Sequence, residues 1–504
     1  MDDDGITLAG LGLTGFPHAG VEPDYASIIS GLAVDSREVK DGYLFIAVPG
    51  TRLDGASFAQ YAVRQGATAV LITPEGLETA KADIGGLPVP FLLTDNPRAE
   101  LAHLAARFHA LQPRTMIAVT GTNGKTSVAD FTRQIWEALG NPAAAFGTTG
   151  VIGEGFAEPL NMTTPEPITL HALLARLASK GCTHAAMEAS SHGLAQHRVD
   201  GVRFAAAGLT NISRDHLDYH PTHEDYVSAK LRLFSEVLPP DGIAVLNIDD
   251  PVYARARKAT GHRPVISVGR AGGATLRLTK SEYRNDGQDI HFVWKNEVYQ
   301  APLSLIGGFQ ADNALLAAGL VIATGERPHE VFSVLHRLTG VRGRMELAGR
   351  RGNGAAVYVD YAHTPDALST ALAALRPHIS GRLIVLGGAG GDRDPGKRPM
   401  MGQAMAAGAD AVIVTDDNPR SEDPAVIRAA VLQGVPEADN IGDRAEAILS
   451  GIDALKSPGD CLLIAGKGHE QGQEIQGVKH PFDDVDQARA AIAALDGIEI
   501  GAAR

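Results

Sequence analysis

A glycine loop at residues 121–127 contains residue types that bind phosphate groups. It follows a predicted strand, Thr115–Val119, and opens a predicted helix, Ser127–Leu139. Glycines let backbone N–H groups turn toward phosphate oxygens, and the helix N-terminus adds positive electrostatic potential. A lysine here can reach the β- and γ-phosphates, and a threonine hydroxyl can ligate Mg²⁺. We therefore expect a nucleotide to bind at Gly121, Thr122, Asn123, Gly124, Lys125, Thr126 and Ser127.

The loop matches the short form of a phosphate loop, G-x-x-G-K-T. The longer form needs a glycine five residues before Gly124, and Val119 stands there. A glycine turn that happens to precede a Lys-Thr pair is the alternative interpretation. The position between a strand and a helix favours nucleotide binding.

Two further segments, 187–194 and 211–220, carry side chains that could bind a metal ion. Mg²⁺ prefers oxygen ligands in octahedral geometry, so Glu188 and Thr126 are suitable and His216 is a tolerable nitrogen ligand. Alone, a Glu or His at a strand end is more often a solvated or capping residue. A phosphate loop in the same predicted domain favours the metal site, because nucleotide phosphates normally arrive with Mg²⁺.

Composition excludes several classes of protein. The chain has 504 residues, with 45 Lys and Arg against 59 Asp and Glu, and its formal charge is −14. A generally basic nucleic-acid surface or an anionic-membrane anchor is therefore disfavoured. Two cysteines argue against a disulfide framework, and the acidic start of the chain does not match a secretory signal. We expect a soluble, cytoplasmic monomer with no nucleic-acid or membrane partner.

From Ile117 onward, short aliphatic runs alternate with Ala-rich amphipathic stretches, which is typical of βα units on a mainly parallel sheet. The predicted fold class is α/β. The other predicted strands are Ala244–Ile248, Ala356–Val359, Arg382–Leu386, Ala411–Val414 and Cys461–Ile464. The other predicted helices are Ile168–Ala178, Tyr226–Val237, Asn313–Ala323, Pro365–Leu375 and Val485–Leu495.

The length of the chain and two candidate domain boundaries predict three domains. One boundary precedes Gln112-Pro113, and the other lies near 339–344, after a helix and before new strand material. The expected domains are residues 1–110, 111–340 and 341–504.

Taken together, the motifs resemble those of the Mur ligase family, the ATP-dependent amide-forming enzymes of peptidoglycan precursor synthesis. The resemblance spans nearly the whole chain. It rests on residues 121–127, 188–194, 211–220, 226–234, 308–313, 343–346, 360–366, 391–399 and 466–470. It implies an N-terminal α/β domain that binds a UDP-linked substrate, a central P-loop parallel-sheet domain that binds ATP, and a C-terminal Rossmann-like domain that binds an amino acid.

The resemblance also assigns roles to individual residues. It implies catalytic roles for Lys125, Glu188, His216 and Lys230, with Mg²⁺ held by Thr126, Glu188, His216 and a carbamylated Lys230. It places Asn313, Arg344 and Asp360 around ATP. It assigns the UDP-linked substrate, UDP-N-acetylmuramoyl-L-alanyl-D-glutamate, to Ser36, Asn161, Thr163, Thr164, Ser190, Gln196 and Arg198. The segment Gly50-Thr51-Arg52 departs from a His-Gln-type pair found in some relatives.

The segment Asp417-Asn418-Pro419-Arg420 resembles the stretch of family members that take meso-2,6-diaminopimelate. Diaminopimelate is lysine with a further carboxylate at its far end, and an arginine offers a planar bidentate fork for such a group. A simple turn after a strand is the alternative interpretation. The implied amino-acid pocket comprises Arg393, Asp417, Asn418, Arg420, Gly466 and Glu470.

Several other functions remain open at this point. Within the family, a member could add L-lysine or D-alanyl-D-alanine instead. Folylpoly-γ-glutamate synthase shares the loop and lysine pattern, but the long N-terminal domain with Val34–Arg37 argues against it. A P-loop ATPase that drives motion belongs to a different class, and it would leave Asp417–Arg420 without a role.

Overall fold

The computed structural model describes residues 5–50, 53–84, 86–213, 215 and 219–497. Thr51, Arg52 and His216, which the sequence analysis singled out, lie outside the described residues. The chain divides into two compact units, Met1–Ser267 with Gly319–Glu326, and Val268–Ala318 with Arg327–Arg504. Each unit is described by itself.

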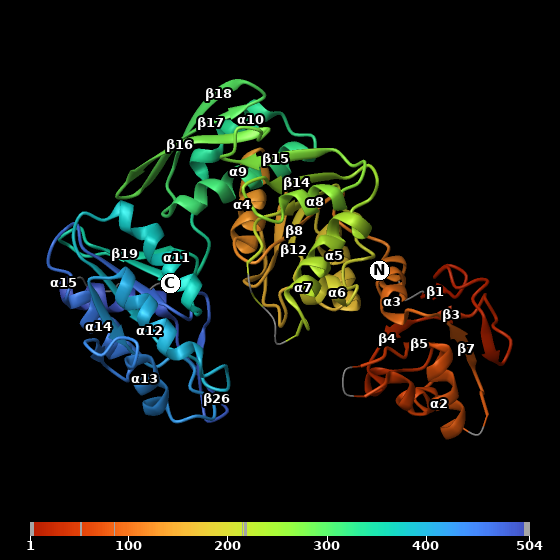
Figure 1. The fold of residues 1–504 in the computed structure, drawn as a ribbon. Coiled ribbons are helices and arrows are strands. Elements are labelled where there is room, and N and C mark those ends of the chain that lie inside the picture. The colour runs from red at the N-terminus through yellow and green to blue at the C-terminus, as the bar shows by residue number, and fades with distance from the viewer. Residues whose placement is uncertain (1–4, 51–52, 85, 214, 216–218, 498–504) are drawn as a thin grey trace. The chain divides into compact units, whose positions relative to one another are not determined.

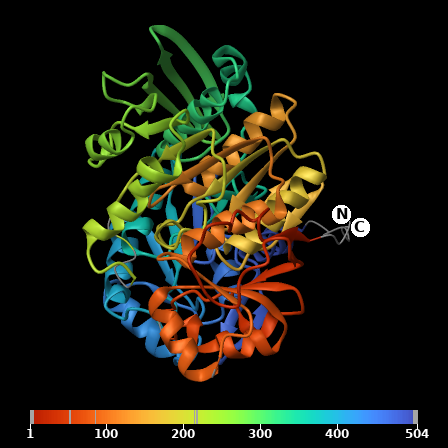
Figure 2. The ribbon, with the colours of Figure 1, turned by 90° about the vertical axis from the view of Figure 1, so that its right-hand side faces the viewer.

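The first unit begins with a small α/β segment, which is the red to orange ribbon in Figure 1 and Figure 2. Its five-stranded sheet has the order β2-β7-β6-β5-β4, in which β4, β5, β6 and β7 run parallel and β2 pairs antiparallel with β7. These strands are β2 (His18–Gly20), β4 (Gly31–Ala33), β5 (Tyr43–Ile46), β6 (Ala67–Ile72) and β7 (Pro90–Leu93). A two-stranded sheet, β1 (Ile6–Thr7) with β3 (Ile28–Ile29), and the helices α1 (Ala59–Arg64), α2 (Pro74–Ile84) and α3 (Pro97–His109) complete this segment.

The second sheet of this unit carries the glycine loop. Its strands follow the order β11-β10-β9-β12-β8-β13-β14-β15, and β9, β12, β8, β13 and β14 run parallel. The strands are β8 (Thr115–Thr120), β9 (Ala143–Gly147), β10 (Gly150–Gly153), β11 (Phe156–Glu158), β12 (His184–Glu188), β13 (Ala206–Leu209), β14 (Ile243–Asn247) and β15 (Val265–Gly269). The helices are α4 (Lys125–Ala138), α5 (Pro167–Ser179), α6 (Ser191–Ala195), α7 (His223–Arg232), which continues as a π-helical turn to Val237, and α8 (Tyr253–Ala259).

The second unit begins with an antiparallel ribbon that the sequence analysis did not predict. Its strands are β16 (Leu276–Arg284), β17 (Gly287–Trp294) and β18 (Glu297–Leu303). Lys295 and Asn296 both take positive φ, at 46° and 76°, which closes the β17–β18 hairpin tightly. Helices α9 (Gly308–Ala323) and α10 (Pro328–Ser333) follow.

The rest of the second unit is a six-stranded sheet with helices on both faces (Figure 1). The strand order is β19-β20-β24-β21-β22-β23, and every pair except β19–β20 is parallel. The strands are β19 (Glu346–Arg350), β20 (Ala356–Asp360), β21 (Leu383–Gly387), β22 (Ala411–Val414), β23 (Asp439–Asn440) and β24 (Cys461–Ala465), with a hairpin of β25 (Gly472–Ile475) and β26 (Val478–Pro481). The helices are α11 (Pro365–Leu375), α12 (Lys397–Gly408), α13 (Pro424–Leu432), α14 (Arg444–Asp453) and α15 (Asp484–Asp496).

The alternation of side chains along these strands explains the two layers of helices. Tyr358, Val385 and Leu463 belong to the core under α11, α12 and α13. Their neighbours along the strands, such as Ile384 and Leu462, belong to the core under α14 and α15. Both faces of a parallel sheet must be covered, so its strands read as continuous aliphatic runs.

The predicted α/β fold class and its parallel sheets are confirmed. Pro365–Leu375 and Ala411–Val414 have the bounds that the sequence predicted, and the other predicted elements lie within a few residues of those observed. Among the described residues, no helix is long and apolar enough to cross a lipid bilayer.

Candidate functional site

The glycine loop connects the carboxyl end of β8 to the first turn of α4, where a phosphate loop is expected. Gly121 has a φ of 146° and Gly124 has a φ of 84°, both in a region that disfavours side chains. A Cβ atom on Gly121 would lie 1.9 Å from Thr210 Oγ1. Glycine is therefore required at this position by a close approach as well as by backbone conformation.

Two lysines converge on one carbonyl oxygen of this loop. Lys125 Nζ donates to Gly121 O at 3.0 Å and to Thr122 O at 2.8 Å, and Lys230 Nζ donates to Gly121 O at 2.7 Å. Burial holds the pKa of Lys230 well below its ordinary value, and the nearby charge of Lys125 lowers this pKa further. The arrangement therefore favours the neutral amine at Lys230.

The loop is held by the segment after β13. Thr122 N donates to Asn211 O at 2.7 Å, and Asn123 N donates to Asn211 Oδ1 at 3.1 Å. The hydroxyls of Thr122 and Tyr226 are 2.9 Å apart. Because Tyr226 lies one turn before Lys230 on α7, this contact ties the helix that carries Lys230 to the loop.

Glu188 lies at the carboxyl end of β12, next to β8 in the sheet. The Thr126 hydroxyl donates to Glu188 Oε1 at 2.9 Å, and Thr148 N donates to the same oxygen at 2.9 Å. A Cβ atom on Gly147 would stand 1.9 Å from Glu188 Oε1, so this glycine leaves room for the carboxylate. Thr148 was not predicted from the sequence, although the Gly147-Thr148 pair at the end of a parallel strand was a usable signal.

The chemistry of these side chains fits Mg²⁺ in part. Thr126 and Glu188 supply the hard oxygen donors that Mg²⁺ prefers, and their oxygen atoms are 2.9 Å apart. The ammonium form of Lys230 has no lone pair and repels a cation, so it fits only after conversion to a carbamate. Among the described residues, no three His, Cys, Asp or Glu side chains form a metal-binding group.

Five of the residues predicted for the UDP-linked substrate form a connected group beside Glu188. Thr164 Oγ1 donates to Glu188 O at 2.9 Å and to Ser190 Oγ at 3.1 Å. Arg198 Nη1 donates to Thr164 O at 2.8 Å, and Arg198 Nη2 donates to the Gln196 side chain at 2.7 Å. The hydroxyl oxygens of Thr163 and Thr148 are 3.4 Å apart.

The other two residues of that prediction lie apart from this group. Ser36 is buried in a short 3₁₀ helix, Ser36–Glu38, which belongs to the N-terminal segment. Asn161 is exposed. The described contacts connect neither of these residues to the group beside Glu188.

The second unit holds the three other residues predicted for ATP. Asn313 is buried on α9 and donates to Gln310 Oε1 at 3.1 Å. Asp360 ends β20, and its two oxygens accept from Met345 N and Ala362 N, both at 2.8 Å. The guanidinium of Arg344 lies over the Tyr361 ring, 4.6 Å from its centroid. Asp360 is not the N-cap of α11, since Thr364 takes that position.

The residues predicted for the amino acid follow the carboxyl ends of three parallel strands, β21, β22 and β24. Asn418 Nδ2 donates to Glu470 Oε2 at 2.9 Å. Arg420 Nη1 donates to Gly391 O at 2.7 Å, and its Nε lies 3.3 Å from Glu474 Oε2. Arg420 has a φ of 52°, a strained conformation of the kind that concentrates at ligand sites.

Gly466 and Asp417, both predicted for the amino acid, approach each other closely. A Cβ atom on Gly466 would lie 2.5 Å from Asp417 Oδ2. Arg444, fully buried, forms a bidentate ion pair with Asp484 and donates to Ala465 O at 3.0 Å. Arg393 donates to Asp392 O at 3.4 Å and has no carboxylate partner among the described residues.

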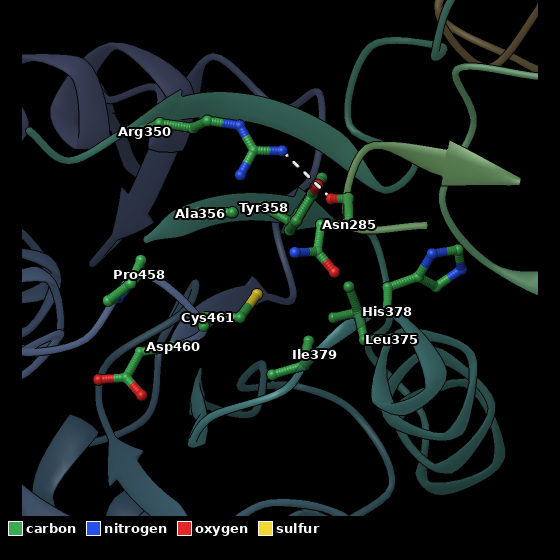
Figure 3. Close-up of a pocket in the computed structure, with 11 residues that line it drawn as sticks. Asn285, Arg350, Ala356, Tyr358, Leu375, His378, Ile379, Pro458, Asp460 and Cys461 are labelled. Carbon is green, nitrogen blue, oxygen red and sulfur yellow. Dashed lines mark hydrogen bonds between the residues drawn. The ribbon is translucent and has the colours of Figure 1, made fainter. Parts of the chain in front are cut away.

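A cavity in the same unit lies at the opposite edge of the sheet (Figure 3). Its lining includes Ala356 and Cys461, the first residues of β20 and β24, together with Arg350 and His378. It contains none of the predicted site residues. The residues predicted for the amino acid and this cavity therefore lie at opposite ends of the parallel strands.

Comparison with known proteins agrees with this arrangement. Three family models match the chain: the Mur ligase family catalytic domain at residues 28–109, the Mur ligase middle domain at 119–321, and the Mur ligase glutamate ligase domain at 343–468. The chain belongs to the Mur ligase family. The six-stranded sheet β19 to β24 lies within the matched residues 343–468, and the sheet that carries the glycine loop lies within 119–321 apart from the start of β8.

Individual relatives are similar over almost their whole length. The UDP-N-acetylmuramoyl-L-alanyl-D-glutamate–2,6-diaminopimelate ligase of Chelativorans sp. (strain BNC1) is 51% identical over 467 residues, covering 92% of this chain and 95% of that protein. The ligase of the same name from Rhizobium meliloti (strain 1021) is 49% identical over 497 residues, covering 97% and 100%.

Solved structures show the same Mur ligase fold. A structure of a UDP-N-acetylmuramoyl-L-alanyl-D-glutamate–2,6-diaminopimelate ligase is 32% identical, with a TM-score of 0.71, covering 97% of this chain and 99% of that one. MurF from Acinetobacter baumannii, at 19% identity and a TM-score of 0.62, shares the fold over 92% of this chain.

Proposed function

We propose that this Mur ligase adds meso-2,6-diaminopimelate to the D-glutamyl γ-carboxylate of UDP-N-acetylmuramoyl-L-alanyl-D-glutamate, with ATP as the energy source. The observation that carries the proposal is sequence identity. About half of the aligned residues, over more than nine-tenths of the chain, are identical to those of UDP-N-acetylmuramoyl-L-alanyl-D-glutamate–2,6-diaminopimelate ligases. The arrangement of Arg420 beside Asn418 and Glu470 supports the choice of amino acid.

Amide formation from a carboxylate requires an activated acyl group. In the proposed reaction a γ-carboxylate oxygen attacks the γ-phosphorus of ATP, the bond to the β-phosphate oxygen breaks, and ADP leaves. The amine then attacks the acyl carbon, loses a proton, and displaces inorganic phosphate. Positioning and charge neutralisation carry most of a phosphoryl transfer, so a site of few, well-placed cations is adequate.

The glycine loop would bind the phosphates of ATP. Its backbone N–H groups and the start of α4 attract negative charge, and Lys125 would exchange its carbonyl partners for phosphate oxygens. Mg²⁺, when bound by Thr126 and Glu188, neutralises phosphate charge. Asn313, Arg344 and Asp360 would bind the adenine, the ribose and the phosphates.

Lys230 would act as a carbamate. A neutral amine is required for addition to CO₂, and burial with the neighbouring Lys125 favours that form. The reaction joins the neutral Nζ to the CO₂ carbon, releases one proton from nitrogen, and leaves a negatively charged carbamate in place of the amine. The carbamate and His216 would complete the oxygen and nitrogen donors for a second Mg²⁺.

The remaining binding residues follow the three expected segments, 1–110, 111–340 and 341–504. Ser36 in the first would bind the uridine part. Asn161, Thr163, Thr164, Ser190, Gln196 and Arg198 in the second would bind the pyrophosphate, muramoyl and dipeptide groups. In the third, Arg393 and Arg420 would bind carboxylates, and Asp417, Asn418, Gly466 and Glu470 would surround the distal amino group.

The product identifies the reaction. The purified protein is incubated with ATP, Mg²⁺ and UDP-N-acetylmuramoyl-L-alanyl-D-glutamate, together with meso-diaminopimelate, L-lysine or D-alanyl-D-alanine. The products are identified from their molecular masses by mass spectrometry. We expect a tripeptide product that contains diaminopimelate. A product that contains lysine, or ADP release with no amide product, would overturn the proposal.

A further inference from the structure

A lysine that the sequence analysis did not assign lies beneath the amino-acid pocket. Lys467 follows β24 between two glycines with positive φ, Gly466 at 117° and Gly468 at 55°. Its side chain is fully buried. Burying an ammonium group is costly unless it is paired and hydrogen-bonded, so its partners are informative.

Those partners are two residues of the predicted pocket. Lys467 Nζ donates to Asn418 Oδ1 at 2.9 Å and lies 3.3 Å from Glu470 Oε2. We propose that Lys467 is a positioning residue that fixes Asn418 and Glu470 for the amino group of the incoming diaminopimelate. This inference rests on the proposed function, because it concerns how the same pocket binds its amino acid.

The first consequence concerns the direction of the Asn418 amide. Its oxygen accepts from Lys467 Nζ and from Glu474 N, both at 2.9 Å. A rotated amide would place its NH₂ group against these two donors, so only one orientation is compatible with both contacts. Lys467 and Glu474 thereby direct Asn418 Nδ2 toward Glu470, 2.9 Å away.

The second consequence concerns the Glu470 carboxylate. Both donors, Lys467 Nζ and Asn418 Nδ2, reach the same oxygen, Oε2. The other oxygen, Oε1, has no hydrogen-bond partner among the described residues, and the Glu470 side chain is 33% exposed. Glu470 Oε2 is thus held by Lys467 and Asn418, while Oε1 remains available to a cationic amino group.

The same contacts extend to the arginine that is proposed to bind the distal carboxylate. Glu474, whose backbone N–H also bonds Asn418, lies 3.3 Å from Arg420 Nε and accepts from Arg420 N at 3.0 Å through its carbonyl. Asn418 therefore lies between Lys467 on one side and the Arg420–Glu474 pair on the other. Loss of Lys467 would loosen groups that meet the amino and carboxylate ends of one ligand.

The test compares kinetic constants for each substrate separately. Lys467→Met keeps a side chain of similar length and removes the ammonium group. Lys467→Gln removes the charge but keeps an N–H donor toward Asn418. We expect KM for diaminopimelate to rise at least about tenfold in Lys467→Met, with a smaller rise in Lys467→Gln. KM for ATP and for the UDP-linked substrate should change less than about twofold. Lys456→Met, an exposed lysine in the same unit, is the matched control and should leave all three constants unchanged.

A double variant separates positioning from general stability. If Lys467 acts through Glu470, Lys467→Met should raise KM less than about threefold in a Glu470→Gln background. The inference would be overturned if Lys467→Met raised KM by the same factor in the Glu470→Gln background as in the wild type. An unchanged KM for diaminopimelate in Lys467→Met, or a parallel rise in all three KM values, would also overturn it. Lys467→Gln carries the test if Lys467→Met does not fold.

The wild-type protein distinguishes the two failures. If it adds lysine instead of diaminopimelate, the proposed function fails, and the inference is judged on KM for lysine. If it adds none of the three amines, both are overturned.

Discussion

The phosphate loop and the amino-acid pocket both follow the carboxyl ends of parallel strands, but they hold their cations differently. In the loop, Lys125 donates to the backbone carbonyl oxygens of Gly121 and Thr122. In the pocket, Lys467 and Arg420 lie beside the carboxylates of Glu470 and Glu474. A carbonyl is a weaker partner for a cation than a carboxylate, so the loop keeps positive charge for an anion. The predicted pocket is closer to charge balance, so we expect it to discriminate by the direction of its donors and acceptors.

The largest effect is expected in the loop. Lys125→Ala should reduce kcat by about 10³, because no other described side chain of the loop supplies a cation to the transferred phosphate. The measurement is coupled ADP release at saturating substrates. Lys180→Ala, which changes an exposed lysine of the same unit, is the control and should retain full activity. A fall in kcat of less than tenfold in Lys125→Ala would contradict the proposal that the loop keeps its positive charge for a phosphate group.

The next effect concerns Lys230 on α7, which also donates to the carbonyl oxygen of Gly121. Lys230→Ala should reduce kcat by about 10²–10³, since the proposed carbamate is lost together with its Mg²⁺. Short-chain carboxylic acids should restore part of the activity by occupying the space of the carbamate. Activity that the substitution leaves unchanged would refute this role, and a loss that carboxylic acids do not rescue would assign Lys230 a purely structural role.

A smaller effect is expected in the pocket. Arg420→Ala should reduce kcat/KM for diaminopimelate by at least about tenfold, because a bidentate bond between charged groups contributes about 1.5–3 kcal/mol. KM for ATP should remain unchanged, since Arg420 lies in the amino-acid pocket. Equal turnover by the variant, or a matching loss of ATP affinity, would contradict the assignment.

The smallest effect on activity is expected away from both regions, at His171. This residue is buried on α5, its Nε2 has no hydrogen-bond partner among the described residues, and burial lowers the pKa of the imidazole to about 4. His109, His103 and Arg203 lower this pKa further by charge repulsion. The folded protein therefore keeps the ring neutral at a pH where the unfolded chain protonates it.

The sign of the pH dependence follows from that difference. Stability from neutral His171 is fully present above the unfolded pKa of about 6.5 and is lost as pH falls toward the folded pKa of about 4. At pH 5 the loss should be about 2 kcal/mol relative to pH 8. Urea unfolding at both pH values should show a smaller loss in His171→Leu, with unchanged activity at pH 8. The same loss in the variant would assign the acid sensitivity to other groups.

The two regions also differ in how much of each the sequence could predict. The loop is contiguous, so residues 121–127 already contained its glycines, its lysine and its hydroxyl. Membership of the Mur ligase family, which followed from several such motifs, is confirmed, and so is the α/β fold class, which followed from the alternation of aliphatic runs with Ala-rich stretches. The roles assigned to individual site residues remain predictions.

Features that depend on distant parts of the chain were missed for a physical reason. Thr148 reaches Glu188 across 40 residues, and Lys467 reaches Asn418 across 49. Sheet order decides these contacts, and no local pattern reports it. The antiparallel strands β16 to β18 were not predicted, because a mainly parallel βα series was expected throughout this part of the chain.

The most direct test of the central claim is ADP release by the wild-type protein with UDP-N-acetylmuramoyl-L-alanyl-D-glutamate, measured with and without each amine. If the loop activates the carboxylate and the pocket selects the amine, steady release should require the nucleotide substrate and be fastest by at least about tenfold with meso-diaminopimelate. Equal release without any amine, or with lysine as with diaminopimelate, would contradict the account.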